Sequence, residues 1–315
     1  MIALLARRIA GLFVTLVIVS LLIFVVMDLL PGDPASIMLG TSAAPETLAA
    51  LRHDLGLDQP LLLRYGHWLA GVLSGDLGSS YTYGVPVAGL IVERLAVTLP
   101  LALMAIMLSV VIAVPLGVLA ASRRGGIFDI IVTLFSQISV AVPAFWVALL
   151  LIILFSTMLG LMPAGGFPGW SAGLLPALQA LAMPAVALAM PQAGVLTRVA
   201  RSAVLDMMHE DFARTAVAKG LSRNAVLWRH IVPNALIPIL TMIGLQFTFL
   251  VAGAVLVENV FNLPGLGRLA LQALSQRDII VMQDVVLFFA ALVIVMNFIV
   301  DLSYLAIDPR MRKAA

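Results

Sequence analysis

The chain lacks cysteine and has few charged residues. With no cysteine among its 315 residues, neither a disulfide framework nor a thiolate metal site is possible. Charged residues make up 11% of the chain, whereas a soluble domain carries about 25%, and hydrophobic residues make up 62%. This composition predicts an integral membrane protein with several spans.

The sequence also lacks the common catalytic motifs. It has no G-x-x-x-x-G-K-[ST] phosphate loop, and its one Gly–Lys neighbour pair, Lys219–Gly220, is in reversed order. His209–Glu210 begins like a zinc-protease motif, but Ala213 stands where the second histidine belongs. A G-x-S-x-G nucleophile motif is absent as well. We therefore expect no catalytic residue, no metal, no cofactor bound by this chain and no nucleic-acid partner.

The apolar stretches are long enough to cross about 30 Å of hydrocarbon at 1.5 Å per helical residue. They predict six transmembrane helices, near residues 9–30, 97–121, 130–159, 177–200, 236–258 and 284–306. Pro184 and Pro191 interrupt the fourth stretch. Because neighbouring helices can satisfy the freed carbonyls, we expect a kinked helix packed inside the bundle.

The basic residues predict the orientation. With the N-terminus inside, 13 of them face the cytoplasm and 5 face outward, so both termini are expected in the cytoplasm. The cytoplasmic set includes Arg310, Arg312 and Lys313 near the C-terminus. The expected organisation is a first span over 1–30, a small extracytoplasmic subdomain of short helices over 31–96, and a five-span core over 97–315. A further short helix is expected in the outer loop 259–283, after its Pro-Gly turn.

The cytoplasmic connection at about 201–235 is too long and too basic for a simple turn. Asp211 can cap a helix that runs to Lys219, and Gly220 offers the left-handed residue that ends such a helix. Ser222 can cap a second helix, which Pro233 is expected to stop. Two short exposed helices at a membrane surface indicate a docking element, with an ordinary surface helix pair as the alternative.

Ionisable residues of the spans lie near the span ends, which disfavours an ion-coupled carrier. The interiors offer neutral polar groups instead, and the candidates for a substrate pathway are Gln137, Ser139, Gln192 and Gln246. Each of them could equally be a hydrogen bond between helices. A secondary transporter or channel, a membrane enzyme and a structural anchor remain the alternatives to a transport subunit that needs a separate engine.

At this point the chain resembles the permeases of ABC importers. Their cytoplasmic EAA loop has a glycine and, further on, a proline, and Gly220 and Pro233 stand at these places. Arg214 replaces the glutamate, and the resulting R-T-A-x-A-K-G form resembles the dipeptide/oligopeptide/nickel subgroup. Further segments similar to that subgroup cover nearly the whole chain: LLPGDPA at 29–35, LGLDQPLLLRYGHWL at 55–69, GDLGSS at 75–80, ERLAVTLPLAL at 93–103, VENVFNLPGLGRL at 257–269 and DLSYLAIDPRMR at 301–312. The long first outer segment resembles the "B" permease of the pair.

The resemblance implies an all-α type I importer permease in the bacterial cytoplasmic membrane. Its implied partners are a sister permease, two cytoplasmic ATPase subunits that hold ATP and Mg, and an extracytoplasmic substrate-binding protein. The implied cargo is di- or oligopeptides, with nickel chelates, glutathione or sugars as alternatives. The implied ATPase-coupling residues are Asp211, Arg214, Thr215, Ala216, Lys219, Gly220, Leu221, Arg223 and Pro233. Ser79 and Arg268, in the outer segments, are expected to contact the binding protein.

Overall fold

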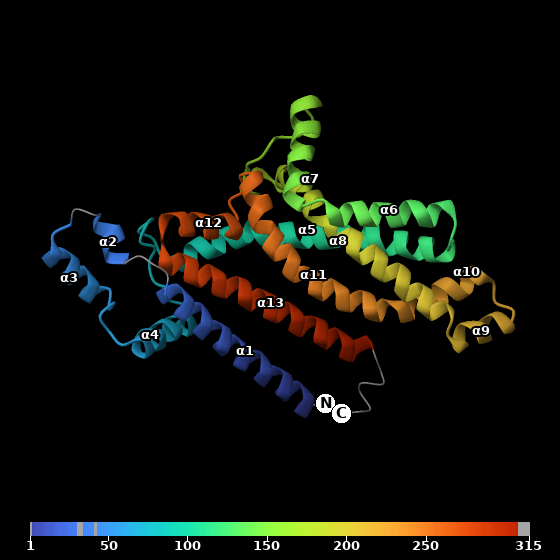
Figure 1. Cartoon of the computed structure of the whole chain (residues 1–315), viewed down its shortest axis with the longest axis horizontal. Helices are drawn as coiled ribbons and strands as arrows, with labels where there is room; N and C mark the ends of the chain where they lie inside the picture. Colours follow the sequence, from blue (N-terminus) through green and yellow to red (C-terminus); the bar gives the residue numbers. More distant parts are fainter. Residues whose placement is uncertain (1, 30–33, 41–42, 308–315) are drawn as a thin grey trace. The chain divides into compact units, whose positions relative to one another are not determined.

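The computed structural model describes residues 2–29, 34–40 and 43–307 (Figure 1). Apart from one isolated β-bridge between Ser79 and Pro86, the regular structure of these residues is helical. The described residues divide into two compact units: one contains those of 99–263 and 296–307, and the other contains those of 2–98 and 264–295. The predicted basic residues Arg310, Arg312 and Lys313 and most of the motif at 29–35 lie outside the described residues.

The all-helical membrane fold is confirmed. Five described helices are long and apolar enough to cross a membrane, and a sixth span is present if one bent helix pair counts as a span. The five are α1 (Ile2–Leu29), α5 (Val87–Ser122), α8 (Leu174–Met208), α11 (Val232–Val260) and α13 (Ile279–Ile307). Helix α5 begins ten residues before the predicted position, so the end of the expected outer segment belongs to this helix.

The third expected span, 130–159, is a broken helix rather than a continuous one. Helix α6 (Ile127–Ala141) and helix α7 (Ala144–Leu151), which continues as a π-helical turn over Ile152–Met158, meet at 99°. Val142 has an extended backbone with φ −93° and ψ 121°. A residue before proline disfavours the helical region, so Pro143 ends α6 at this point.

The fourth expected span, by contrast, is continuous. Helix α8 includes both Pro184 and Pro191 without a break and extends to Met208. It contacts α6, α7 and α11, which makes it the central helix of the first unit. Helices packed on several sides can re-satisfy the carbonyl that each proline leaves without a donor, as the sequence led us to expect.

Two glycines let neighbouring helices approach α8 closely. A Cβ atom added to Gly194 would lie 2.8 Å from both the Ser136 carbonyl oxygen and the Ser139 Cβ of α6. A Cβ added to Gly117 of α5 would lie 2.6 Å from the Cβ of Ala200 and 2.8 Å from the Thr197 carbonyl oxygen. Small residues replace the hydrophobic driving force that helices lack in lipid, because they bring backbones into van der Waals contact.

The second unit contains the short helices that the sequence predicts. These are α2 (Pro34–Leu39), α3 (Pro45–Asp54) and α4 (Leu61–Ser74), together with α12 (Leu266–Gln276). Leu266, Leu269 and Ala273 of α12 are buried against the start of α5 and the start of α13. The backbone N–H of Leu266 donates to the Thr98 hydroxyl at 2.8 Å, which fixes the beginning of α12 on α5.

Polar and aromatic contacts tie the segments of the second unit together. Asp278 precedes α13 and accepts from the Ser80 hydroxyl at 2.5 Å and from the Thr82 N–H at 3.0 Å. Trp68 of α4 donates its indole N–H to Asp284 at 2.8 Å and lies beside Phe24 of α1, with ring centroids 5.7 Å apart. These contacts give the segment between α1 and α5 a defined structure.

We expect Gly117→Ala to destabilise the protein, because the added methyl group would collide with α8. Overpacking of this kind costs typically about 1–3 kcal/mol. The matched control is Gly89→Ala in the same helix, where an added Cβ meets nothing within 4 Å. The measurement is the melting temperature of the purified protein in detergent. Equal melting temperatures for the two variants would contradict the close packing of α5 on α8.

Candidate functional site

The connection between α8 and α11 begins with a short helix that ends in a defined motif. Helix α9 (Asp211–Ala218) is followed by Gly220, whose φ of +86° lies in the left-handed region. The Gly220 N–H donates to the Val217 carbonyl at 2.9 Å and the Leu221 N–H to the Ala216 carbonyl at 3.3 Å. These two bonds form a Schellman motif, in which glycine supplies the left-handed conformation. The predicted end of this helix at Gly220 is confirmed.

One prediction about the start of α9 is wrong. Glu210, not Asp211, occupies the N-cap position, with an extended backbone and without a side-chain capping bond. Asp211 is the first helical residue, where its negative charge still favours the positive end of the helix dipole. Its side chain lies 3.8 Å from Arg214, and both side chains are largely exposed, so this pair contributes little.

The inward face of α9 is anchored to the rest of the first unit. Ala213 and Ala216 are buried in a hydrophobic cluster with Val118 of α5 and Val204 of α8. Their spacing of three residues places both methyl groups on one side of the helix. Ala216, an expected coupling residue, therefore packs inside this chain.

The exposed surface of α9 and of the turn after it combines apolar and charged side chains. Phe212 is 39% exposed, Val217 is 49% exposed, and Leu221, just after the helix, is 37% exposed. The other expected coupling residues that are exposed are Asp211, Arg214, Thr215, Lys219, Gly220, Arg223 and Pro233. Exposed apolar groups among cations are typical of a surface that a partner covers.

The second half of the connection is only partly as predicted. Ser222 caps the next helix, α10 (Arg223–Val226), by accepting from the Ala225 N–H at 3.3 Å. Pro233 does not stop this helix: a π-helical turn over Leu227–Ile231 leads directly into α11. Pro233 lies in the first turn of α11, where a missing N–H is tolerated. The predicted docking element is thus one short helix followed by an extension of a span.

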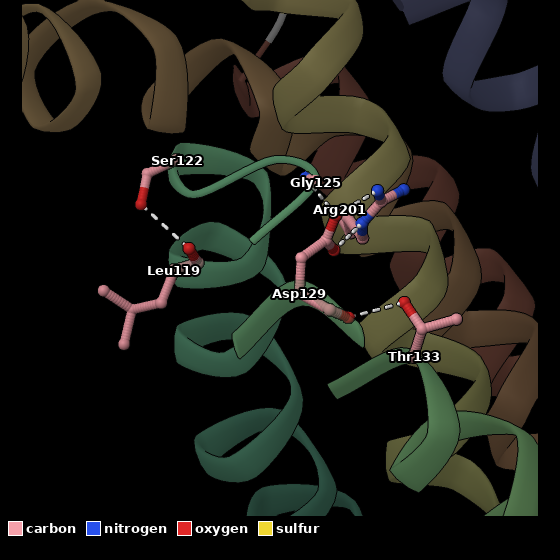
Figure 2. Close-up of polar contacts among 6 residues, drawn as sticks. All are labelled: Leu119, Ser122, Gly125, Asp129, Thr133 and Arg201. Atoms are coloured by element: carbon pink, nitrogen blue, oxygen red, sulfur yellow. Dashed lines mark hydrogen bonds and ion pairs between the residues drawn. The ribbon is translucent and has the colours of Figure 1, made fainter. Parts of the chain in front are cut away.

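An ion pair lies close to this connection in the first unit. Arg201 of α8 donates from Nε to Asp129 Oδ1 at 2.5 Å and from Nη2 to Asp129 Oδ2 at 2.8 Å (Figure 2). Asp129 Oδ2 also accepts from the Gly125 N–H at 2.9 Å, in the turn between α5 and α6. The Asp129 side chain is only 7% exposed and that of Arg201 is 30% exposed. Arg201 therefore holds both the start of α6 and the turn before it.

The four candidate pathway residues lie in different environments. The Gln246 amide of α11 is buried and donates to the Gln192 carbonyl of α8 at 2.8 Å. Ser139 is buried beside Gly194, and Gln192 is half-buried. Gln137 is exposed on α6. The structure therefore brings three of the four residues together around one stretch of α8 and leaves the fourth on the surface.

The two residues that are expected to contact a binding protein also differ in exposure. Ser79 is exposed next to its β-bridge with Pro86. Arg268 of α12 is half-buried and interacts within the chain. The second unit also contains a cleft of about 410 Å³, lined by residues of α1, α4 and α13, by the segment from Asp54 to Gln59 and by Tyr81. Burial raises the pKa of Tyr81 above its ordinary value, and nearby Asp278 adds to this effect.

Comparison with known families accounts for this arrangement. Residues 113–313 match the family described as binding-protein-dependent transport system inner membrane component, and residues 1–102 match the N-terminal family of the same membrane components. The chain belongs to this family of ABC importer permeases. It is therefore a multi-pass inner membrane protein and a permease subunit of an importer.

Relatives support the membership along the whole permease. It is 42% identical over 312 residues to a protein of Brucella abortus (strain 2308) that carries the provisional name of a peptide transport system permease, and the match covers 99% of both chains. It is 39% identical over 306 residues to a glutathione transport system permease protein of Salmonella typhimurium, with 97% of both covered. An inward-facing structure of the MetNI methionine ABC transporter matches 70% of this chain and 96% of that chain, with a TM-score of 0.57 and 20% identity. That likeness supports the fold.

The Asp129–Arg201 pair was not predicted from the sequence. Asp129 had a local signal. An acidic residue at the third position of a helix often accepts a hydrogen bond from a free N–H just before the helix, and Asp129 is the third residue of α6, after Gly125 and Gly126. Arg201 had no such signal, since it lies 72 residues further along the chain.

Proposed function

We propose that this permease imports di- or oligopeptides. The support is the provisional naming of the Brucella relative for peptide transport, over nearly its full length. The glutathione permease points in the same direction, because glutathione is itself a small peptide. Nickel chelates and sugars are the competing cargoes within the same machinery.

The proposed machine contains a different sister permease, two ATPase subunits that bind ATP and Mg, and a substrate-binding protein. Both termini and the α8–α11 connection face the cytoplasm in this proposal, as the 13-to-5 distribution of basic residues favours. The permease supplies one half of the pathway, and the ATPases supply the energy. Alternating access then proceeds by movement of the two permeases against each other.

The observation that carries the coupling proposal is the two-sided character of α9. Its alanines fix one face to this chain, while Phe212 and Val217, on the two flanks of that face, and Leu221, just after the helix, remain exposed near basic residues. A groove on the ATPase with apolar walls and a carboxylate rim would complement this surface. Burial of the three apolar side chains would supply affinity, and the cations would favour the correct register.

We expect Gly220→Val to uncouple ATP hydrolysis from transport while the permease stays in the membrane. A β-branched residue at φ +86° is strained by about 1–3 kcal/mol. The Schellman turn would therefore open, and the direction of α9 relative to the segment that follows it would change. Steric collision is not the cause, because an added Cβ at Gly220 meets nothing within 4 Å. The measurement is peptide uptake and ATP hydrolysis by the complex reconstituted in vesicles.

The matched control is Gly220→Asn, since asparagine tolerates the left-handed region and should keep most of the transport. Arg214→Glu should also be mild, because exposed ion pairs are worth at most about 1 kcal/mol. Normal transport by Gly220→Val would show that α9 is not a tight docking element.

For the pathway we propose Gln137 as a residue that meets the substrate. A pathway between two permeases is lined by groups that are exposed on either chain alone, and Gln137 is such a group. Gln246, by its bond to the Gln192 carbonyl, is better suited to hold α11 on α8. Ser139 and Gln192, close to the same stretch of α8, belong with Gln246 in this proposal.

We expect Gln137→Leu to change peptide uptake or its inhibition by other peptides without loss of assembly. Gln246→Leu should instead lower the melting temperature, because a helix–helix hydrogen bond in membrane proteins contributes about 0.6 kcal/mol on average. Uptake of a labelled dipeptide is measured against a panel of di- and tripeptides, glutathione, sugars and free amino acids. If no peptide competes in the unaltered complex, the proposed cargo is wrong.

We propose that the exposed loop around Ser79 contacts the substrate-binding protein outside the cell. Since the chain has no cysteine, Ser79→Cys introduces a single thiol. A membrane-impermeant maleimide should label this thiol in spheroplasts, and a thiol cross-linker should capture the binding protein. Thr215→Cys on α9 is the control: it should be protected in spheroplasts and should capture the ATPase in inverted vesicles. Labelling of Thr215→Cys from outside would overturn the orientation.

A further inference from the structure

Helices α6 and α8 contact each other at two levels in one antiparallel register. At one level the Ser136 hydroxyl donates to the Gly194 carbonyl at 2.5 Å, and at the other Arg201 binds Asp129. Ser136 lies seven residues after Asp129, and Gly194 lies seven residues before Arg201. Seven residues correspond to about 10.5 Å of helix, so the two contacts match in spacing on both helices. The register of α6 along α8 is therefore fixed at two points.

The ion pair is the contact nearer to α9. Arg201 lies seven residues before the last residue of α8, Met208, and α9 begins at Asp211. Between Arg201 and Met208 the chain is continuous helix without a proline. A displacement of α9 thus reaches Arg201 through about two turns of rigid helix.

The pair is also built to hold α6 firmly. The guanidinium binds both oxygens of the carboxylate, which fixes direction as well as distance. The same carboxylate binds the Gly125 N–H, so the turn from α5 moves with it. At its other end α6 stops at the 99° bend before α7. Helix α6 is accordingly an element with a fixed end near α9 and a bend at the far end.

We propose that the Asp129–Arg201 pair is a positioning clamp that makes α6 follow the movement of α9, so that ATP-driven displacement reaches the bend between α6 and α7. This proposal rests on the proposed docking of α9 to the ATPases. In this proposal the two residues touch neither ATP nor substrate; they transmit the displacement of α9 to α6. Without the clamp, the Ser136–Gly194 contact still ties α6 to α8, but the end of α6 near α9 can lag behind a shift of α8, and hydrolysis proceeds with less transport.

The test uses Asp129→Asn and Arg201→Gln in the complete complex reconstituted in vesicles. Asparagine keeps an oxygen for the Gly125 N–H and removes the charge, so the turn is retained while the clamp is lost. The ratio of peptide transported to ATP hydrolysed should fall on the order of fivefold or more, the usual range for coupling between two sites. Arg198→Gln, exposed on the same helix, is the matched control and should keep the ratio.

Two further variants separate transmission from stability. Asp129→Asn combined with Arg201→Gln should be no worse in ratio than either single change, because the pair is broken only once. Arg201→Lys keeps the charge and loses the two-pronged geometry, so it should give an intermediate ratio. The melting temperature and the yield of assembled complex are recorded for every variant.

The results can contradict the clamp in a defined way. Uptake and hydrolysis that fall together at an unchanged ratio, with a lower melting temperature, would make the pair merely structural. If Asp129→Asn does not assemble, Arg201→Lys decides, and a wild-type ratio there overturns the clamp. Cross-linking through Thr215→Cys separates the two proposals. If Thr215→Cys captures the ATPase but the variants of Asp129 and Arg201 keep the wild-type ratio of transport to hydrolysis, the clamp alone is refuted. If Thr215→Cys captures no ATPase in the otherwise unaltered complex, the docking of α9 is refuted and the clamp with it.

Discussion

The close approach of α5 and α6 to α8 is the constraint on which the first unit depends. Water cannot drive helices together within lipid, so contact must come from shape and from hydrogen bonds. Gly117 and Gly194 supply the shape, since neither position leaves room for a Cβ. The Ser136 bond to the Gly194 carbonyl then fixes the helices in register at the point of closest approach.

The position of α9 depends on this packing. Ala213 and Ala216 of α9 lie against side chains of α5 and α8 in one hydrophobic cluster, so the direction of α9 follows from the arrangement of these longer helices. The Schellman turn at Gly220 adds the exit direction. The exposed side chains of α9 are consequently held on a packed base, which is what the proposed coupling to an ATPase requires.

An ion pair adds a second kind of contact between α6 and α8 at the start of α6. A buried aspartate without a partner would be costly, and Arg201 together with the Gly125 N–H satisfies it. Near the start of α6, where α8 continues toward α9, the Asp129–Arg201 pair holds the two helices together, whereas further along α6 the close approach at Gly194 does so. Shape complementarity in the interior and charge at the end thus give one helix pair two different kinds of contact.

Local sequence signals predicted several elements correctly because the physics that decides them is local. The left-handed residue at Gly220 and the cap at Ser222 depend on a few neighbouring residues, and both are present. Pro143 and Pro233 show the limit of such signals. A proline in an apolar stretch can break a helix, as Pro143 does, or fall into the first turn of one, as Pro233 does, and the neighbours in space select the outcome.

By itself, the sequence determined the membrane class, the short helices between the first two spans and the place where α9 ends, because composition, apolar length and glycine chemistry are properties of the chain. Only the tertiary structure decided which polar residues work together. Gln246 meets the Gln192 carbonyl across 54 residues and Asp129 meets Arg201 across 72, and no local rule connects such distant positions. Those pairings follow from the register of packed helices, which is set by the collective fit of many side chains.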